Sequence, residues 1–136
     1  MSQLGELLFP LPDQRRTAWS ILNWWESRRL VFNALVGAAG VLTLVLVHLL
    51  LWLPPHPVRA VAPWQLVVAY GVLANVCYTL GWLTEAGLQR LWGDDAPRVG
   101  PALFRQGLAF SIGLTLFPVA LAGLSWLLRV YQLLVG

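Results

Sequence analysis

Few side chains in this sequence could carry acid–base or metal chemistry, and they are widely spaced. The chain contains two histidines and six carboxylates, and none of them stand at the spacing of a metal-ligand motif. His48 and Glu85 are of interest because both belong to long apolar stretches, where an ionisable group is costly and suggests a function by default. We predict no catalytic residue and no metal site.

His48 lies in the outer half of the first apolar stretch. An imidazole there could ligate haem, but a bis-histidine haem needs a second ligand, and His56 lies among prolines. A symmetric dimer could supply a second His48. The simpler interpretation is a neutral side chain that is hydrogen-bonded across helices or near the membrane surface. We therefore predict no cofactor, with haem at His48 as the alternative.

Glu85 stands at the inner end of the second apolar stretch, which is otherwise free of charge. Small proton-driven exporters place their coupling carboxylate well inside the membrane, whereas Glu85 is expected at its border. The sequence therefore favours an ion pair with Arg29, Arg90 or Arg105. A proton-coupling role remains the alternative.

Two amides lie deeper within the apolar stretches, Asn33 in the first and Asn75 near the centre of the second. Amides in hydrocarbon need partners, which an interhelical hydrogen bond supplies. Packing is therefore the predicted role and a substrate contact is the alternative. The residues that could form an intramembrane polar site are Asn33, His48, Asn75, Tyr78, Glu85 and Arg105.

The densest group of polar and aromatic side chains precedes the first apolar stretch. It comprises Trp24, Trp25, Glu26, Arg28 and Arg29. Tryptophan favours the membrane–water interface, and arginine reaches lipid phosphate from there. We predict a membrane anchor in which Glu26 pairs with Arg29 one turn later. The alternative is a binding site for a protein partner or an anionic lipid.

The elements that position these residues are three long apolar helices. Hydrophobic residues make up 58% of the chain and charged residues 11%, against about 25% charged in a soluble domain. Three stretches with few charges or none, at about residues 30–53, 62–85 and 105–128, each exceed the roughly 20 residues needed to span a bilayer as a helix. The predicted fold is an all-α integral membrane protein.

Residues 1–29 are predicted to form a separate N-terminal segment, cytoplasmic or interfacial, before a transmembrane domain over residues 30–136. Its polar residues recur at helical spacing, and the apolar ones lie largely elsewhere around the helix. An amphipathic helix at the lipid headgroups is the expected structure. No helix breaker occurs between Gln14 and Leu53, so one helix could also run from the membrane surface into the first span.

Arginine placement predicts the orientation. All nine basic residues are arginine, and seven fall before the first span or between the second and third. Positive residues favour the cytoplasmic side, so an inner-membrane protein with a cytoplasmic N-terminus and an opposite C-terminus is expected. Nucleic-acid binding is disfavoured because the arginines flank apolar segments instead of forming a basic face.

The sequence carries no nucleotide-binding, protease or thiol motif. Scarce intramembrane charge favours a small, non-enzymatic accessory or partner-binding subunit of a membrane complex. One alternative is a homo-oligomeric transporter or channel, since three helices are too few to enclose a pathway alone. The other is the membrane anchor of an enzyme. Expected partners are the lipid bilayer and either another protein or further copies of this chain.

Overall fold

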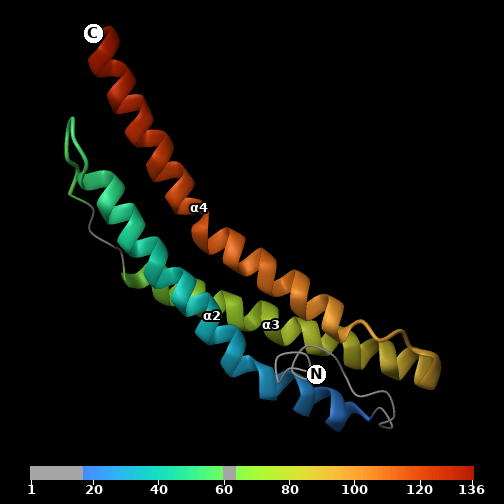
Figure 1. Ribbon diagram of the computed structural model, residues 1–136. Helices are drawn as coiled ribbons and strands as arrows, with labels where there is room; N and C mark the ends of the chain where they lie inside the picture. The colour runs from blue at the N-terminus through green and yellow to red at the C-terminus, as the bar shows by residue number, and fades with distance from the viewer. Residues whose placement is uncertain (1–16, 60–63) are drawn as a thin grey trace, which may run out of the picture.

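The structure, a computed structural model, describes residues 17–59 and 64–136. These ranges hold three long helices, α2 (Ala18–Trp52), α3 (Trp64–Trp92) and α4 (Gly100–Val135), with the short 3-10 helix η1 (Gly93–Asp95) between α3 and α4. The labels follow Figure 1. All three long helices are long and apolar enough to cross a membrane, which confirms the three helices expected from the sequence.

Local sequence explains where the helices begin and end. Thr17 and Ser20 form a capping box that satisfies backbone donors at the start of α2. Two prolines follow Leu53, and proline cannot continue a helix. Gly93 has a φ of 59° in the turn after α3, a backbone conformation that glycine adopts without steric cost.

The predicted interfacial helix is not a separate element within the described residues. Residues from Ala18 to Arg29 form the first third of α2 and continue into the apolar part without interruption. The part of this predicted segment before Thr17 lies outside the described residues. At about 1.5 Å per residue, α2 is about 50 Å long, well beyond the roughly 30 Å of a hydrocarbon core.

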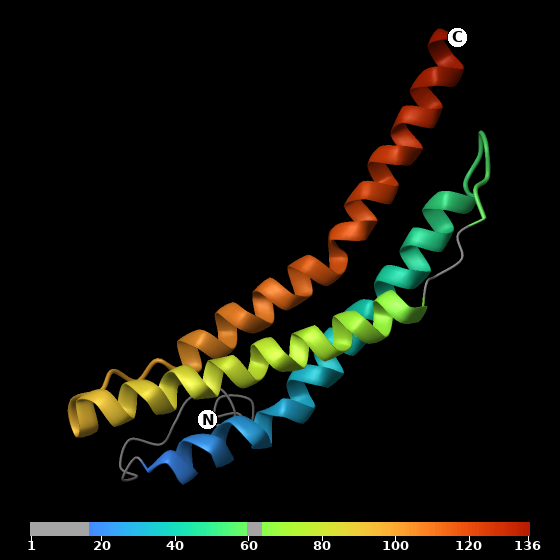
Figure 2. The same ribbon diagram turned by 180° about the vertical axis from the view of Figure 1, so that it is seen from behind.

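The helices alternate in direction along the bundle. Figures 1 and 2 show α2 and α4 running the same way, with α3 running in the opposite direction. The start of α2, the end of α3 and the start of α4 therefore share one end of the bundle, here called the arginine-rich end. At the opposite end α2 and α4 continue past the start of α3. Helix α4 bends along its length and contains Pro118, as expected for a proline inside a helix.

Hydroxyl groups join the helices at mid-bundle. Thr43 of α2 donates to the carbonyl of Thr115 in α4 over 2.8 Å. Tyr70 of α3 donates to the carbonyl of Ser111 over 2.8 Å and lies 2.7 Å from the Thr115 hydroxyl. These bonds satisfy polar groups between helices whose outer surfaces are largely apolar.

Arg129 of α4 closes the C-terminal end of α2. Its guanidinium donates to the carbonyls of Leu50 at 2.9 Å and His56 at 2.6 Å, with a longer contact of 3.4 Å to Leu51. The last carbonyls of a helix have no partner within the helix, and a cation there also complements the helix dipole. The side chain therefore caps α2 and fixes the start of the following connection.

Replacement of Arg129 by glutamine is expected to loosen this cap. Charge-assisted hydrogen bonds contribute about 1.5–3 kcal/mol each when well formed, and partial exposure reduces that here. We expect faster amide hydrogen exchange over the last turn of α2 and the connection, measured by mass spectrometry. Replacement of the exposed Arg90 by glutamine should leave exchange in that region unchanged.

Candidate functional site

An aromatic cluster fills the centre of the arginine-rich end. Trp25 of α2 is only 2% exposed and packs edge-on against Tyr78 of α3 and Phe104 of α4, with ring centroids 5.2 and 6.2 Å apart. The ring centroid of Phe32, two turns further along α2, lies 4.8 Å from that of Tyr78. Such tilted and edge-on arrangements are favoured by aromatic quadrupoles. All three helices thus meet around Trp25.

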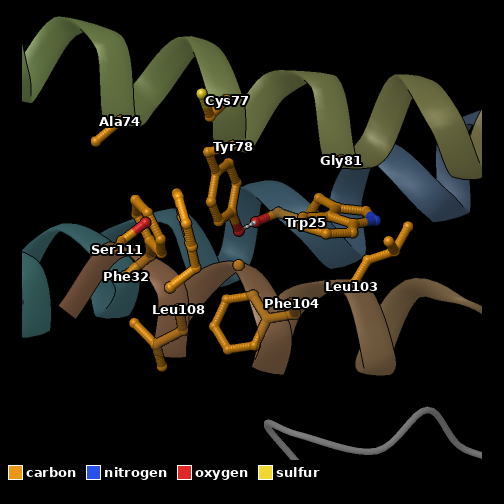
Figure 3. A pocket seen from close by; sticks show the side chains of 12 residues that line it. Trp25, Phe32, Ala74, Cys77, Tyr78, Gly81, Leu103, Phe104, Leu108 and Ser111 are labelled. Carbon is orange, nitrogen blue, oxygen red and sulfur yellow. Dashed lines mark hydrogen bonds between the residues drawn. The ribbon is translucent and has the colours of Figure 1, made fainter. Parts of the chain in front are cut away.

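Close packing around Trp25 depends on a glycine in α3. A β-carbon at Gly81 would come within 2.8 Å of the Trp25 ring, a distance that real contacts do not tolerate. The Tyr78 hydroxyl donates to the Trp25 carbonyl (Figure 3), which fixes α3 against α2 a second time. The Trp25 ring is therefore buried between the helices, and the role of Trp24, Trp25, Glu26, Arg28 and Arg29 as a membrane anchor stays a prediction.

Glu85 forms a junction of all three helices beside this cluster. Its side chain is 5% exposed, and its Oε2 accepts a 2.7 Å hydrogen bond from the Trp25 indole Nε1. The same carboxylate lies against Gly100, the first residue of α4, where a β-carbon would stand 2.3 Å from Oε2. We call Trp25, Glu85 and Gly100 the Glu85 junction.

The Glu85 junction also explains how α4 begins. The residue before α4 is Val99, and no side-chain cap bond is found there. A helix N-terminus carries a partial positive charge and unpaired donors, so an anion delivered from α3 is favoured at this position. Glu85 thus supplies electrostatic stabilisation that Val99 cannot. The sequence predicted an arginine partner, and the indole and the helix end are contacts that it did not predict.

The two arginines near the start of α2 differ in their surroundings. Arg28 is 6% exposed, lies 4.0 Å from the Trp24 ring centroid and donates to the Trp24 carbonyl over 3.0 Å. Arg29 pairs with Glu26 at 2.7 Å, as predicted, and donates to Thr79 of α3 over 3.2 Å. Arg28 therefore packs on its own helix, and Arg29 ties α2 to α3.

The amides of Asn33 and Asn75 bond to each other between α2 and α3. Each Nδ2 donates to the other Oδ1, over 3.3 and 2.9 Å, and the Asn75 amide also reaches the Gly71 carbonyl at 3.0 Å. The predicted interhelical hydrogen bond is therefore confirmed.

Replacement of Asn75 by leucine is expected to destabilise the bundle by about 1 kcal/mol, because interhelical hydrogen bonds in membrane proteins contribute about 0.6 kcal/mol on average and up to about 1.7. The Asn33 amide would lose its partner. Unfolding in detergent with increasing dodecyl sulfate measures the change. The double replacement of Asn33 and Asn75 by leucine should cost less than the sum of the two single changes.

Two of the predicted site residues, His48 and Arg105, are exposed. The His48 ring is exposed on α2, and its Nδ1 donates to the Leu44 carbonyl of its own helix over 2.7 Å. Arg105 is exposed near the start of α4. Within residues 17–59 and 64–136, no three His, Cys, Asp or Glu side chains are grouped to hold a metal ion.

A cavity of about 90 Å³ lies next to the aromatic cluster. Figure 3 shows Trp25 and Phe32 from α2 behind it, with α3 and α4 on its two sides. Its lining includes Cys77 and Gly107, which are exposed at the surface, so the cavity opens outward between α3 and α4. We call it the α3–α4 groove.

The structure thus brings together Trp25, Tyr78 and Glu85 from the predicted site residues, and pairs Asn33 with Asn75 nearby. It adds Phe104, Gly81 and Gly100, which sequence reasoning did not assign to the site. Gly81 belongs to a row of small residues at helical spacing in α3, Gly71, Ala74, Cys77 and Gly81, but only the structure identifies Trp25 as its neighbour.

Searches against family models, curated proteins and solved structures find no match to this chain.

Proposed function

We propose that this chain is a non-enzymatic inner-membrane protein that binds a protein partner as a subunit of a membrane complex. The observation that carries the proposal is that polar side chains of the three helices form hydrogen bonds to one another. Glu85 bonds Trp25, Asn75 bonds Asn33, and Thr43 bonds Thr115. Side chains that hold helices together are engaged in structure and are poorly placed to contact a substrate.

The outer surface supports the same proposal. In the most apolar window of each long helix, 17%, 11% and 11% of residues are buried, so each helix presents most of its apolar side chains outward. Lipid can cover that surface, and so can the helices of another protein. Two of the polar side chains that would line a transport pathway, Asn75 and Glu85, are bonded to other side chains of the same chain, and Glu85 is also buried.

Native mass measurement after mild detergent extraction from its own membrane tests the proposal. We expect a defined complex containing this chain and a second protein in fixed stoichiometry. A stable monomer that carries no other protein would contradict it. A homo-oligomer would instead favour the transporter alternative, which reconstituted flux that is lost in Asn75→Leu and Glu85→Gln would support.

We further propose that the arginine-rich end faces the cytoplasm. Seven of the nine arginines belong to this end or to the segment before it, which is the distribution expected of cytoplasmic segments. Because α2 and α4 run in the same direction, the C-terminus then lies on the opposite side. We expect green fluorescent protein fused after Gly136 to be dark and alkaline phosphatase fused there to be active. The reverse pattern would contradict this orientation.

A further inference from the structure

Buried side chains are unevenly distributed along the bundle. Within the described part of the chain, the buried residues of α2 lie between Ile21 and Thr43. In α4, four of the five buried residues stand before Pro118, and only Ala122 follows it. Residues 119–135 of α4, here called the C-terminal arm, therefore contribute one buried side chain to the bundle, and that side chain is small.

Helix α3 does not accompany the C-terminal arm. Figures 1 and 2 show α2 and α4 continuing past the start of α3 at this end of the bundle. Lipid covers separated apolar helices as well as a partner helix does, so helices in a membrane are held together by close packing and by hydrogen bonds. Because the arm buries so little, its attachment to α2 depends largely on polar contacts.

Pro118 separates the C-terminal arm from a firmly held part of α4. Just before Pro118, the Thr115 carbonyl accepts a hydrogen bond from Thr43 of α2 over 2.8 Å. The Ser111 carbonyl, one turn earlier, accepts one from Tyr70 of α3, also over 2.8 Å. Proline has no N–H and clashes with the preceding turn, so α4 loses a backbone hydrogen bond there and bends. The helix is thus fixed to both neighbours on one side of Pro118 and weakened at Pro118 itself.

Polar contacts near the end of the C-terminal arm join it to the end of α2. The Arg129 guanidinium donates to the Leu50 and His56 carbonyls over 2.9 and 2.6 Å. The Trp126 indole donates to the Pro54 carbonyl over 3.0 Å. Among the described residues, the Arg129 Nε is buried with no hydrogen-bond partner, which lowers the net gain from these contacts. The arm is therefore held near its end by contacts of modest net strength.

We propose that the C-terminal arm is a movable element that swings away from α2 about Pro118, with Arg129 as the latch that holds it closed. A segment with few buried contacts opens at a low cost in free energy, and the broken backbone hydrogen-bond ladder at Pro118 lets the helix change direction there. Opening would separate α2 from α4 at the end of the bundle opposite the arginine-rich end. This inference goes beyond the proposed function, because the movement lies within one chain and needs no partner.

Double electron–electron resonance on the full chain in phosphatidylcholine vesicles tests the proposal. Nitroxides are attached to Leu49→Cys on α2 and Leu127→Cys on the C-terminal arm, both exposed positions. The exposed native thiol is removed by Cys77→Ser. We expect a main distance for the closed arm and a minor, longer one for the open arm. Arg129→Gln should convert most of the closed population into the open one and raise the mean distance by several ångströms.

Pro118→Ala tests the hinge separately from the latch. Alanine restores the backbone N–H and its helical hydrogen bond, so adding it to Arg129→Gln should narrow the distribution to a single peak. Arg90→Gln replaces an exposed arginine at the other end of the bundle and should leave the distribution as in the wild type. A second label pair, Leu35→Cys with Phe110→Cys, lies before the hinge at exposed positions and should report the same distance in every variant.

The wild-type distribution decides the question even where a variant fails to fold. One narrow distance in the wild type would overturn the proposal, because the C-terminal arm would then not open. An unchanged distribution in Arg129→Gln would also overturn it, since Arg129 would then hold nothing closed. So would a broad distribution that persists when Pro118→Ala is added, or an equal change at the Leu35–Phe110 pair, because the movement would then not be centred on Pro118.

Discussion

Replacement of Trp25 by alanine is expected to lower the free energy of unfolding by about 3–5 kcal/mol, the range for truncating a buried large aromatic side chain. Trp25 is 2% exposed and contacts Tyr78, Phe104 and Glu85 from the other two helices. Its removal leaves a cavity at the point where the three helices meet. Unfolding in detergent with increasing dodecyl sulfate, followed by circular dichroism, measures the loss.

Two further tryptophan variants separate packing from hydrogen bonding. Trp25→Phe keeps most of the ring volume but removes the Nε1 donor to Glu85, so an intermediate loss of about 1–3 kcal/mol is expected. Trp19→Ala removes a side chain that is 75% exposed and should change little. Equal losses for Trp19→Ala and Trp25→Ala would show that Trp25 is not at the centre of the packing.

The burial of Trp25 is a feature that the sequence alone could not predict. Hydropathy located the three helices because apolar length is a property of each segment alone. Trp24 and Trp25 are neighbours about 100° apart around one helix, and both rings lie 6.2 Å from the Phe104 ring, yet only Trp25 is fully buried. Which of them is buried depends on where Gly81 of α3 leaves room, and this contact joins residues 56 positions apart in the sequence.

The polar contacts also differ in whether the sequence could predict them. The Glu26–Arg29 pair spans three residues of one helix and follows from helix geometry. The Asn33–Asn75 bond could be expected because amides within apolar helices need hydrogen-bond partners. An arginine partner for Glu85 stays a prediction, whereas the bond to the Trp25 indole was not expected. Its contact with the start of α4 depends on Val99 providing no cap, together with a helix crossing that the sequence does not specify.

Replacement of Glu85 by alanine is expected to destabilise the protein by about 2–4 kcal/mol. It removes the acceptor for the Trp25 indole, which leaves a buried donor unpaired at about 1–3 kcal/mol. It also removes an anion from the start of α4, which contributes about 0.3–1 kcal/mol and up to about 2 when partly buried. Glu85→Gln keeps an acceptor oxygen and should lose only the second contribution. Glu26→Gln, at an exposed pair, should lose about 0–1 kcal/mol.

Gly100 then tests whether Glu85 acts through the end of α4. Gly100→Ala places a β-carbon 2.3 Å from the present position of Glu85 Oε2, so the carboxylate must move away and the wild-type protein should be destabilised. In the Glu85→Ala background that overlap is gone. Alanine favours a helix over glycine by up to about 1 kcal/mol, the value for a helix interior. Gly100 is the first residue of α4, so the same substitution should be neutral or slightly stabilising in that background.

This reversal of sign is the expected result of the double-mutant cycle measured by unfolding in dodecyl sulfate. Gly113→Ala, in the interior of α4 with open space around it, is the control and should have the same effect in both backgrounds. Purely local helix propensity at Gly100 would give the same change in both backgrounds and would contradict a coupled junction. A sign reversal confined to Gly100 would tie the beginning of α4 to a carboxylate that α3 supplies, and through Trp25 to α2.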